Sequence, residues 1–122
     1  MNALLNAMHE MGIANSVLDA VRHESNLRHG AHVAKVGVRI GELASVDPES
    51  LRFCFEALVS GTDLEPLELD LEFCPRRNRC QRCGELFGVA DFLFTCPKCN
   101  SAETKFAGGD ELEFAYMEIE ET

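Results

Sequence analysis

Two pairs of cysteines carry the clearest chemical signal in the sequence. Cys80 and Cys83 form one C-x-x-C pair, and Cys96 and Cys99 form the second after a spacer of twelve residues. This spacing brings four thiolates to one point, which is typical of a tetrahedral metal site, most often zinc. Because four thiolates leave no open coordination position, the pattern favours a structural role over a catalytic one.

Two alternatives stay open for these cysteines. A rubredoxin-like iron site uses the same pairs, and spacing does not separate iron from zinc. Two unrelated thiol pairs are also conceivable, but Gly84 and Asn100 follow the pairs at equivalent positions and both tolerate a positive φ, which favours one shared metal. We expect four phenylalanines to form the apolar packing around the site: Phe87, Phe92, Phe94 and Phe106.

A second and fainter candidate site is Met8-His9-Glu10, at the predicted start of the first helix. An imidazole beside a carboxylate, next to free backbone N–H groups, is a possible set of metal donors. A metalloprotease motif is excluded, since His-Glu-x-x-His needs a second histidine where Ile13 stands. From the residues alone, a solvated histidine beside a helix-favouring acid is the preferred explanation.

The elements that must position these residues follow from apolar periodicity. Residues 8–27 read as an amphipathic helix, 32–40 as a half-buried strand, 47–60 as a second helix, and 67–73 and 111–121 as strands. Asp47-Pro48-Glu49 is a helix start, with Asp47 at the N-cap. In the last strand the apolar parity changes near Tyr116, which predicts a bulge or a change of sheet face.

This order predicts an α+β fold, with two helices on a three-stranded sheet and an inserted zinc-ribbon module. The last strand, residues 111–121, is expected to pair with the first two strands. The predicted domains are a discontinuous α/β domain, residues 1–73 and 107–122, and a zinc-binding domain, residues 74–106.

Composition restricts the class of protein. The 122 residues carry a formal net charge of −10, which disfavours nucleic acid binding, although residues 75–105 hold six basic and three acidic side chains. No apolar run is long enough for membrane insertion, and no secretory signal is visible. With cysteines in metal-type spacing, a cytoplasmic location is expected.

Taken together, the motifs resemble the HypA/HybF family of nickel-insertion accessory proteins of [NiFe]-hydrogenase maturation. The resemblance covers residues 8–121 and rests on an ordered set of segments: Met8–Met11, Val36–Leu43, Asp47–Phe53, Gly61-Thr62, the paired cysteine turns and Gly109–Leu112.

The resemblance implies a nickel metallochaperone rather than an enzyme. It implies zinc at Cys80, Cys83, Cys96 and Cys99. It also implies nickel at Met8, His9 and Glu10, with His9 as the essential ligand, and it implies a HypB-type GTPase and the hydrogenase large subunit as partners. Adjacent nitrogen donors suit square-planar Ni(II).

The sequence departs from the family pattern at two places. Seven residues, Met1 to Ala7, precede Met8, whereas family members usually begin at the Met of Met-His-Glu, where the terminal amine can bind nickel. We expect the extension to reflect an upstream start. Asn100 replaces the usual glycine of the second turn. The rival functions are a rubredoxin-like electron carrier and a zinc-ribbon nucleic acid module that uses Arg76, Arg77, Arg79 and Arg82.

Overall fold

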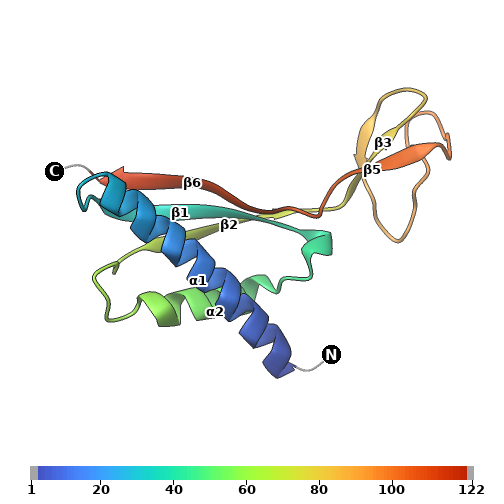
Figure 1. Ribbon diagram of the computed structural model, residues 1–122. Coiled ribbons are helices and arrows are strands. Elements are labelled where there is room, and N and C mark those ends of the chain that lie inside the picture. The colour runs from blue at the N-terminus through green and yellow to red at the C-terminus, as the bar shows by residue number, and fades with distance from the viewer. Residues whose placement is uncertain (1–2, 121–122) are drawn as a thin grey trace. The chain divides into compact units, whose positions relative to one another are not determined.

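The structure divides the chain into two compact units (Figure 1). It is a computed structural model that describes residues 3–120, with their side chains from residue 9 onward. The first unit holds residues 1–39, 46–72 and 113–122, and the second holds residues 40–45 and 73–112. The second unit therefore includes residues 40–45, Phe73 and residues 107–112, which the predicted boundaries assign to the first domain.

The first unit is a three-stranded sheet with both helices on one face (Figure 1). Its elements are α1 (Ala3–Leu27), β1 (His32–Gly41), α2 (Pro48–Val59), β2 (Glu68–Cys74) and β6 (Leu112–Glu120). The strand order β2-β1-β6 places the last strand beside β1. The predicted α+β class is thus confirmed. Apolar side chains of the helices and strands form its core: Val17, Leu18, Val21, Val36, Val38, Leu51, Phe55 and Leu69.

Helix α1 begins earlier than predicted. It starts at Ala3, so His9 lies in its second turn and the prediction that Met8-His9-Glu10 opens the helix is wrong. The physical reason is local: residues 3–7 are mostly alanine and leucine, which favour helix, and neither proline nor glycine interrupts them. No described helix, α1 included, is long and apolar enough to cross a membrane.

Helix α2 begins as its sequence predicts. Asp47 is the N-cap in an extended conformation, and its side chain accepts a hydrogen bond from the backbone N–H of Glu49. Pro48 occupies the first helical position, where its missing N–H costs nothing. Cys54 faces the core, as expected from the apolar stripe of this helix.

The side chain of Tyr116, on β6, lies over the middle strand β1 at Gly37. A Cβ atom on Gly37 would overlap the edge of the Tyr116 ring and lie 2.7 Å from its Cζ. Beyond β1, the Tyr116 hydroxyl donates to Asp70 of β2. That hydrogen bond, together with burial and the charges of Asp70 and Glu118, raises the pKa of Tyr116 to about 12.

This crossing accounts for the change of parity in the last strand. Strand β6 runs without interruption from Leu112 to Glu120. Met117 and Ile119 are half-buried, whereas Phe114 and Tyr116 are exposed. No change of sheet face is needed, because the second apolar set lies on the opposite face of the same strand.

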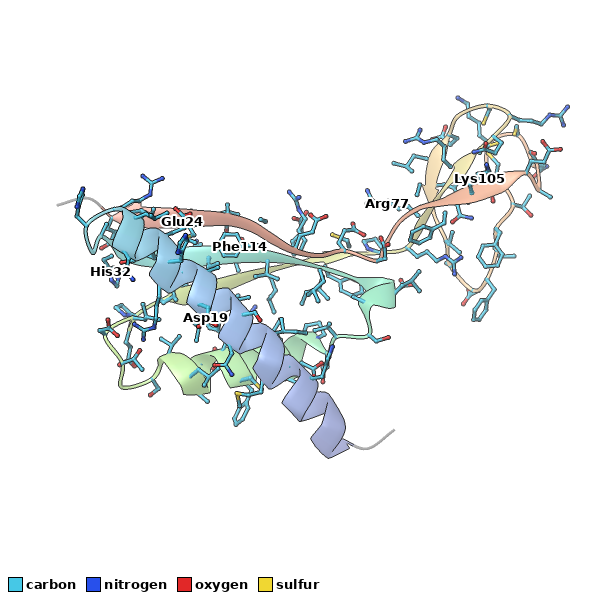
Figure 2. The ribbon with its side chains drawn as sticks, viewed as in Figure 1. Asp19, Glu24, His32, Arg77, Lys105 and Phe114 are labelled. Atoms are coloured by element: carbon cyan, nitrogen blue, oxygen red, sulfur yellow. The ribbon has the colours of Figure 1, made fainter. Side chains whose placement is uncertain are left out.

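The second unit contains a smaller sheet in the order β4-β3-β5. Its elements are the 3-10 helix η1 (Glu42–Ala44), β3 (Arg77–Cys80), β4 (Leu86–Gly88) and β5 (Thr104–Gly108). Strand β3 pairs with both neighbours in antiparallel fashion, and Figure 2 labels Arg77 and Lys105 on β3 and β5. These strands were not predicted, since three to five residues rich in charge, cysteine and glycine give no alternation to detect.

Two hydrogen bonds hold the end of β1 in the second unit. The N–H of Gly41 donates to the carbonyl of Glu111, and the N–H of Leu43 donates to that of Gly109, both at 2.6 Å. A Cβ atom on Gly41 would overlap the Gly109 carbonyl and lie 2.5 Å from the Glu111 nitrogen. Only glycine fits this approach, and segment 40–45 therefore packs with the cysteine-rich residues.

Candidate metal centres

The structure brings the four paired cysteines to one point at the end of β3. Their sulfur atoms all lie within 4.8 Å of one another. The closest pairs are Cys80 with Cys99 at 3.5 Å and Cys83 with Cys96 at 3.6 Å. A tetrahedral zinc ion with Zn–S bonds of about 2.3 Å holds its sulfur ligands about 3.8 Å apart. The thiols are not joined by disulfides, and their spacing fits such an ion.

Two equivalent turns present these thiols. In each turn, the backbone N–H of the residue two positions after the first cysteine donates to the sulfur of that cysteine. These hydrogen bonds run from Arg82 to Cys80 and from Lys98 to Cys96, both at 3.4 Å. The turns close at Gly84 and Asn100, whose φ angles are 80° and 63°. Asparagine is one of the few other residues that tolerate this conformation, so Asn100 replaces glycine without loss of the turn.

The thiols of the cluster differ in their pKa. The N–H groups of Cys83 and Arg82 donate to Cys80, and despite burial the pKa of Cys80 falls to about 6. At Cys99 the N–H of Ser101 also favours the thiolate, but the Cys80 thiol and burial outweigh it and raise the pKa to about 12. The Cys80 thiolate therefore forms readily, whereas a thiolate at Cys99 is opposed. A divalent, thiolate-binding ion such as zinc removes this opposition.

The apolar packing around the cysteines is smaller than predicted. Phe87 is buried against Cys80 and Cys96, with Val89 packed beside them. The other three phenylalanines expected there are exposed, so that part of the prediction is wrong: Phe92, Phe94 and Phe106. The ion and the turns need little apolar cover, because coordination replaces a core in so small a unit.

The second candidate site is a pair of adjacent side chains on α1. The His9 imidazole is 56% exposed, whereas the Glu10 carboxylate is 1% exposed. Nδ1 of His9 lies 3.3 Å from Oε1 of Glu10. The other carboxylate oxygen, Oε2, has no hydrogen-bond partner among the described residues. A carboxylate in this position favours a proton on Nδ1, which leaves Nε2 free as a metal donor. Met8 lies in α1, and its side chain is outside the described part of the chain.

The remaining imidazoles are not gathered into a third site. Within residues 9–120, the four cysteines are the only group of three or more potential ligands that comes together. His23 and His29 are exposed, and His32 is half-buried at the start of β1.

Two of the four arginines considered for nucleic acid contact bind polar groups of the protein. Arg77 pairs with Glu111 at 3.1 Å, and Arg79 donates to the carbonyl of Gly84 at 3.0 Å. Arg76 stacks on two aromatic rings. Contacts within the protein thus compete with phosphate binding at Arg77 and Arg79.

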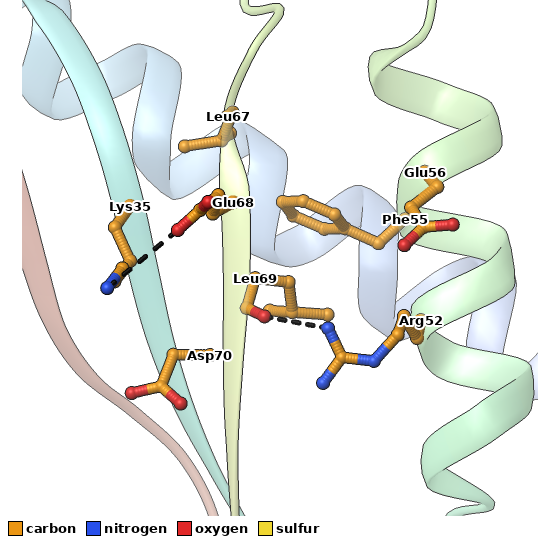
Figure 3. Close-up of a pocket in the computed structure, with 8 residues that line it drawn as sticks. All are labelled: Lys35, Arg52, Phe55, Glu56, Leu67, Glu68, Leu69 and Asp70. Atoms are coloured by element: carbon orange, nitrogen blue, oxygen red, sulfur yellow. Dashed lines mark hydrogen bonds and ion pairs between the residues drawn. The ribbon is translucent and has the colours of Figure 1, made fainter.

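A groove of about 480 Å³ follows β2 in the first unit (Figure 3). Arg52 of α2 donates to the carbonyl of Leu69 at 2.9 Å, and Lys35 pairs with Glu68 at 3.8 Å. Its lining contains neither cysteine nor histidine, so it offers no soft or imidazole donor for zinc or nickel. The side chain of Arg52 donates its hydrogen bond to a backbone carbonyl of β2, an edge strand of the sheet.

Comparisons with known proteins cover the part of the chain that holds both candidate centres. A family model described as hydrogenase/urease nickel incorporation, metallochaperone, hypA matches residues 8–119, which include His9 and all four paired cysteines. Residues 1–7 lie outside the match. The hydrogenase maturation factor HypA of Chlorobium limicola is 40% identical over 114 residues, covering 93% of this chain and 98% of that protein. Its counterpart from Chlorobaculum tepidum is 39% identical over 113 residues, covering 93% and 100%.

Two solved structures share the fold. The solution structure of the Ni metallochaperone HypA from Helicobacter pylori superposes with a TM-score of 0.59 at 20% identity, covering 90% of this chain and 96% of that one. A second solution structure, of a HypA protein, gives a TM-score of 0.65 at 22% identity, covering 92% and 96%.

Proposed function

This chain belongs to the HypA family of nickel-incorporation metallochaperones, and from that premise we propose that it binds Ni(II) and delivers it to the large subunit of a [NiFe]-hydrogenase. The observation that carries the proposal is the family match over residues 8–119, a segment that includes an exposed histidine and a cluster of four cysteines. The protein acts by transfer of an ion and not as an enzyme.

The nickel site is centred on His9. Its imidazole is accessible, and Glu10 supports it from the buried side. The backbone nitrogens of Met8 and His9 complete a square-planar set only after the first turns of α1 unwind, because an N–H in the second turn of a helix is already hydrogen-bonded. Nickel binding therefore competes with the helical form of residues 3–9.

The zinc site has a structural role at Cys80, Cys83, Cys96 and Cys99. The ion supplies the cohesion of residues 74–106, whose own core is limited to a few side chains. The nickel-binding domain is the first unit, residues 1–39, 46–72 and 113–122. Absence of visible colour in the metal-loaded protein distinguishes zinc from a ferric thiolate site.

The partners follow from the same premise. We assign a HypB-type GTPase and the hydrogenase large subunit, acting together in the cytoplasm. The first unit carries fifteen acidic and five basic residues, which opposes nucleic acid as a partner.

Nickel titration by calorimetry tests the proposal. His9→Ala is expected to weaken nickel binding at least tenfold, whereas His23→Ala, an exposed histidine on the same helix, leaves it unchanged. A chain that begins at Met8 is expected to bind more tightly, because it offers a terminal amine and fewer helical turns to unwind. Equal affinities for the wild type and His9→Ala refute the nickel site. Delivery is measured as nickel gained by the purified large subunit.

A further inference from the structure

Exposed apolar side chains gather in the second unit on the loop that joins β4 to the second cysteine turn. Phe92 is 83% exposed and Leu93 is 68% exposed. Phe94, the next residue, and Phe106 of β5 are also exposed. We call these four residues the apolar tip. Several large exposed apolar side chains on one small unit are typical of a binding site.

The metal site does not explain the apolar tip. The buried contacts around the cysteines come from Phe87 and Val89. Moreover, Asp91 and Phe92 are held at φ angles of 53° and 59°, a conformation that a bulky side chain rarely adopts. The protein thus holds Phe92 outward at a cost in backbone energy.

The loop is fixed rather than frayed. The N–H of Leu93 donates to the carbonyl of Ala90 at 3.0 Å, and the Thr104 hydroxyl donates to the carbonyl of Phe94 at 2.6 Å. Leu93 also borders a hollow of about 300 Å³ that is lined by Phe87, Ala90, Cys96 and Pro97. A preformed hollow beside exposed rings can accept an apolar side chain at little entropic cost.

A positive charge accompanies these rings. The Arg76 guanidinium lies 4.7 Å from the centroid of Phe94 and 5.9 Å from that of Phe106. Among the described residues no carboxylate forms an ion pair with Arg76, and its Nε is buried without a hydrogen-bond partner. By contrast, Arg77 and Lys98 of the same unit are paired with Glu111 and Glu85.

We propose that the apolar tip and Arg76 form a docking surface for an acidic, amphipathic segment of a partner protein. An apolar side chain of the partner fills the hollow beside Leu93, and a partner carboxylate pairs with Arg76. The charge selects the partner, because a basic segment would leave Arg76 unpaired and repelled. The inference rests on the proposed function in one respect, that nickel delivery requires a protein partner.

The test uses two labelled twelve-residue peptides, one alternating leucine with glutamate and the other leucine with lysine. Fluorescence anisotropy with the zinc-loaded chain is expected to show at least tenfold tighter binding of the glutamate peptide. Phe92→Ser combined with Leu93→Ser should weaken that binding at least tenfold. Phe53→Ser is the matched control, since Phe53 is 72% exposed but lies on α2 in the other unit.

Arg76→Gln separates charge from apolar contact. It should reduce the preference for the glutamate peptide without abolishing apolar binding, and it keeps the proposal testable if the double variant fails to retain zinc. The nickel affinity of each variant is measured in parallel and should be unchanged. A wild type that binds the peptide but no nickel would refute the proposed function alone.

Several outcomes overturn the docking surface. They are failure of the wild type to bind the glutamate peptide, equal binding of the two peptides, and wild-type affinity in the Phe92/Leu93 double variant. Sedimentation that shows a dimer dissociated by the same double variant would assign the surface to a second copy of the chain. Tighter binding of a single-stranded oligonucleotide than of the peptide would assign it to nucleic acid.

Discussion

The crossing of Tyr116 over Gly37 yields a prediction about stability. Gly37→Ala adds a methyl group 2.7 Å from Cζ of Tyr116, and still closer to the ring edge, where ordinary contacts begin at 3.4 Å. The ring cannot simply rotate away, because its hydroxyl is bonded to Asp70. Overpacking of this kind costs about 1–3 kcal/mol. Since a small domain is stable by about 5–15 kcal/mol, we expect a folded but weakened first unit.

Urea unfolding followed by far-UV circular dichroism measures this loss. Both α-helices belong to the first unit, so the helical signal reports that unit. With a urea m-value of about 2 kcal/mol/M, a loss of about 2 kcal/mol lowers the midpoint by about 1 M. Tyr116 is the only tyrosine and the chain has no tryptophan, so tyrosine fluorescence also reports the displaced ring directly.

Two controls isolate the contact. Gly12→Ala introduces a methyl group with no atom within 4 Å, in an exposed part of α1, and should stabilise the protein by up to about 1 kcal/mol. In a Tyr116→Ala background, Gly37→Ala should cost nothing and should instead favour the strand slightly. An equal loss from Gly37→Ala in both backgrounds would falsify the steric explanation.

Three further predictions concern other contacts. The absorbance titration of Tyr116 should give a pKa of about 12, and Asp70→Asn should return this pKa toward 10. Because the folded pKa lies above the unfolded one, the stability that this hydrogen bond contributes is complete below pH 10 and is lost between pH 10 and 12. Coinciding titrations of the native and unfolded protein would refute this contribution. Cys80→Ser should release zinc and loosen the second unit, while the circular dichroism signal of the helices persists. The control Cys54→Ala, at a buried position of α2, should retain zinc. Complete unfolding of Cys80→Ser would contradict the division into two units. Gly41→Ala places a methyl group against the backbone of Gly109 and should speed the loss of zinc to a chelator. The control Gly88→Ala, whose methyl group meets no atom within 4 Å, should not change this rate. Equal rates for the two variants would refute the role of the close approach at Gly41.

Local chemistry made much of the fold predictable. The N-cap at Asp47 and the positive φ angles at Gly84 and Asn100 follow from single residues, and the observed conformations agree with them. The clustering of the cysteines follows from spacing alone. These features depend on neighbours in sequence, and sequence reasoning is reliable there.

Contacts between distant segments escaped prediction. Gly37 gave no signal of its own, because its reason is the ring of Tyr116, distant along the chain. The burial of Glu10 was not predicted either, because the other buried residues of the same helix face are apolar and a carboxylate is not expected among them. The phenylalanines of the apolar tip were assigned to packing because their hydrophobicity suggests a core, whereas so small a metal unit has little interior to offer them.

The pairing of β3 with β5 also has a consequence for how the larger sheet assembles. In the unfolded chain, β2 and β6 are separated by the 37 residues from 75 to 111. Once zinc folds the second unit, Arg77 lies opposite Gly108, and only about five connecting residues remain outside the paired segment. Shortening a loop about sevenfold lowers its closure entropy by about 1.7 kcal/mol at 25 °C. On the proposed structural role of zinc at the four cysteines, the ion helps β6 to pair with β1, although the cysteines lie on neither strand, and loading of the ion favours completion of the first unit.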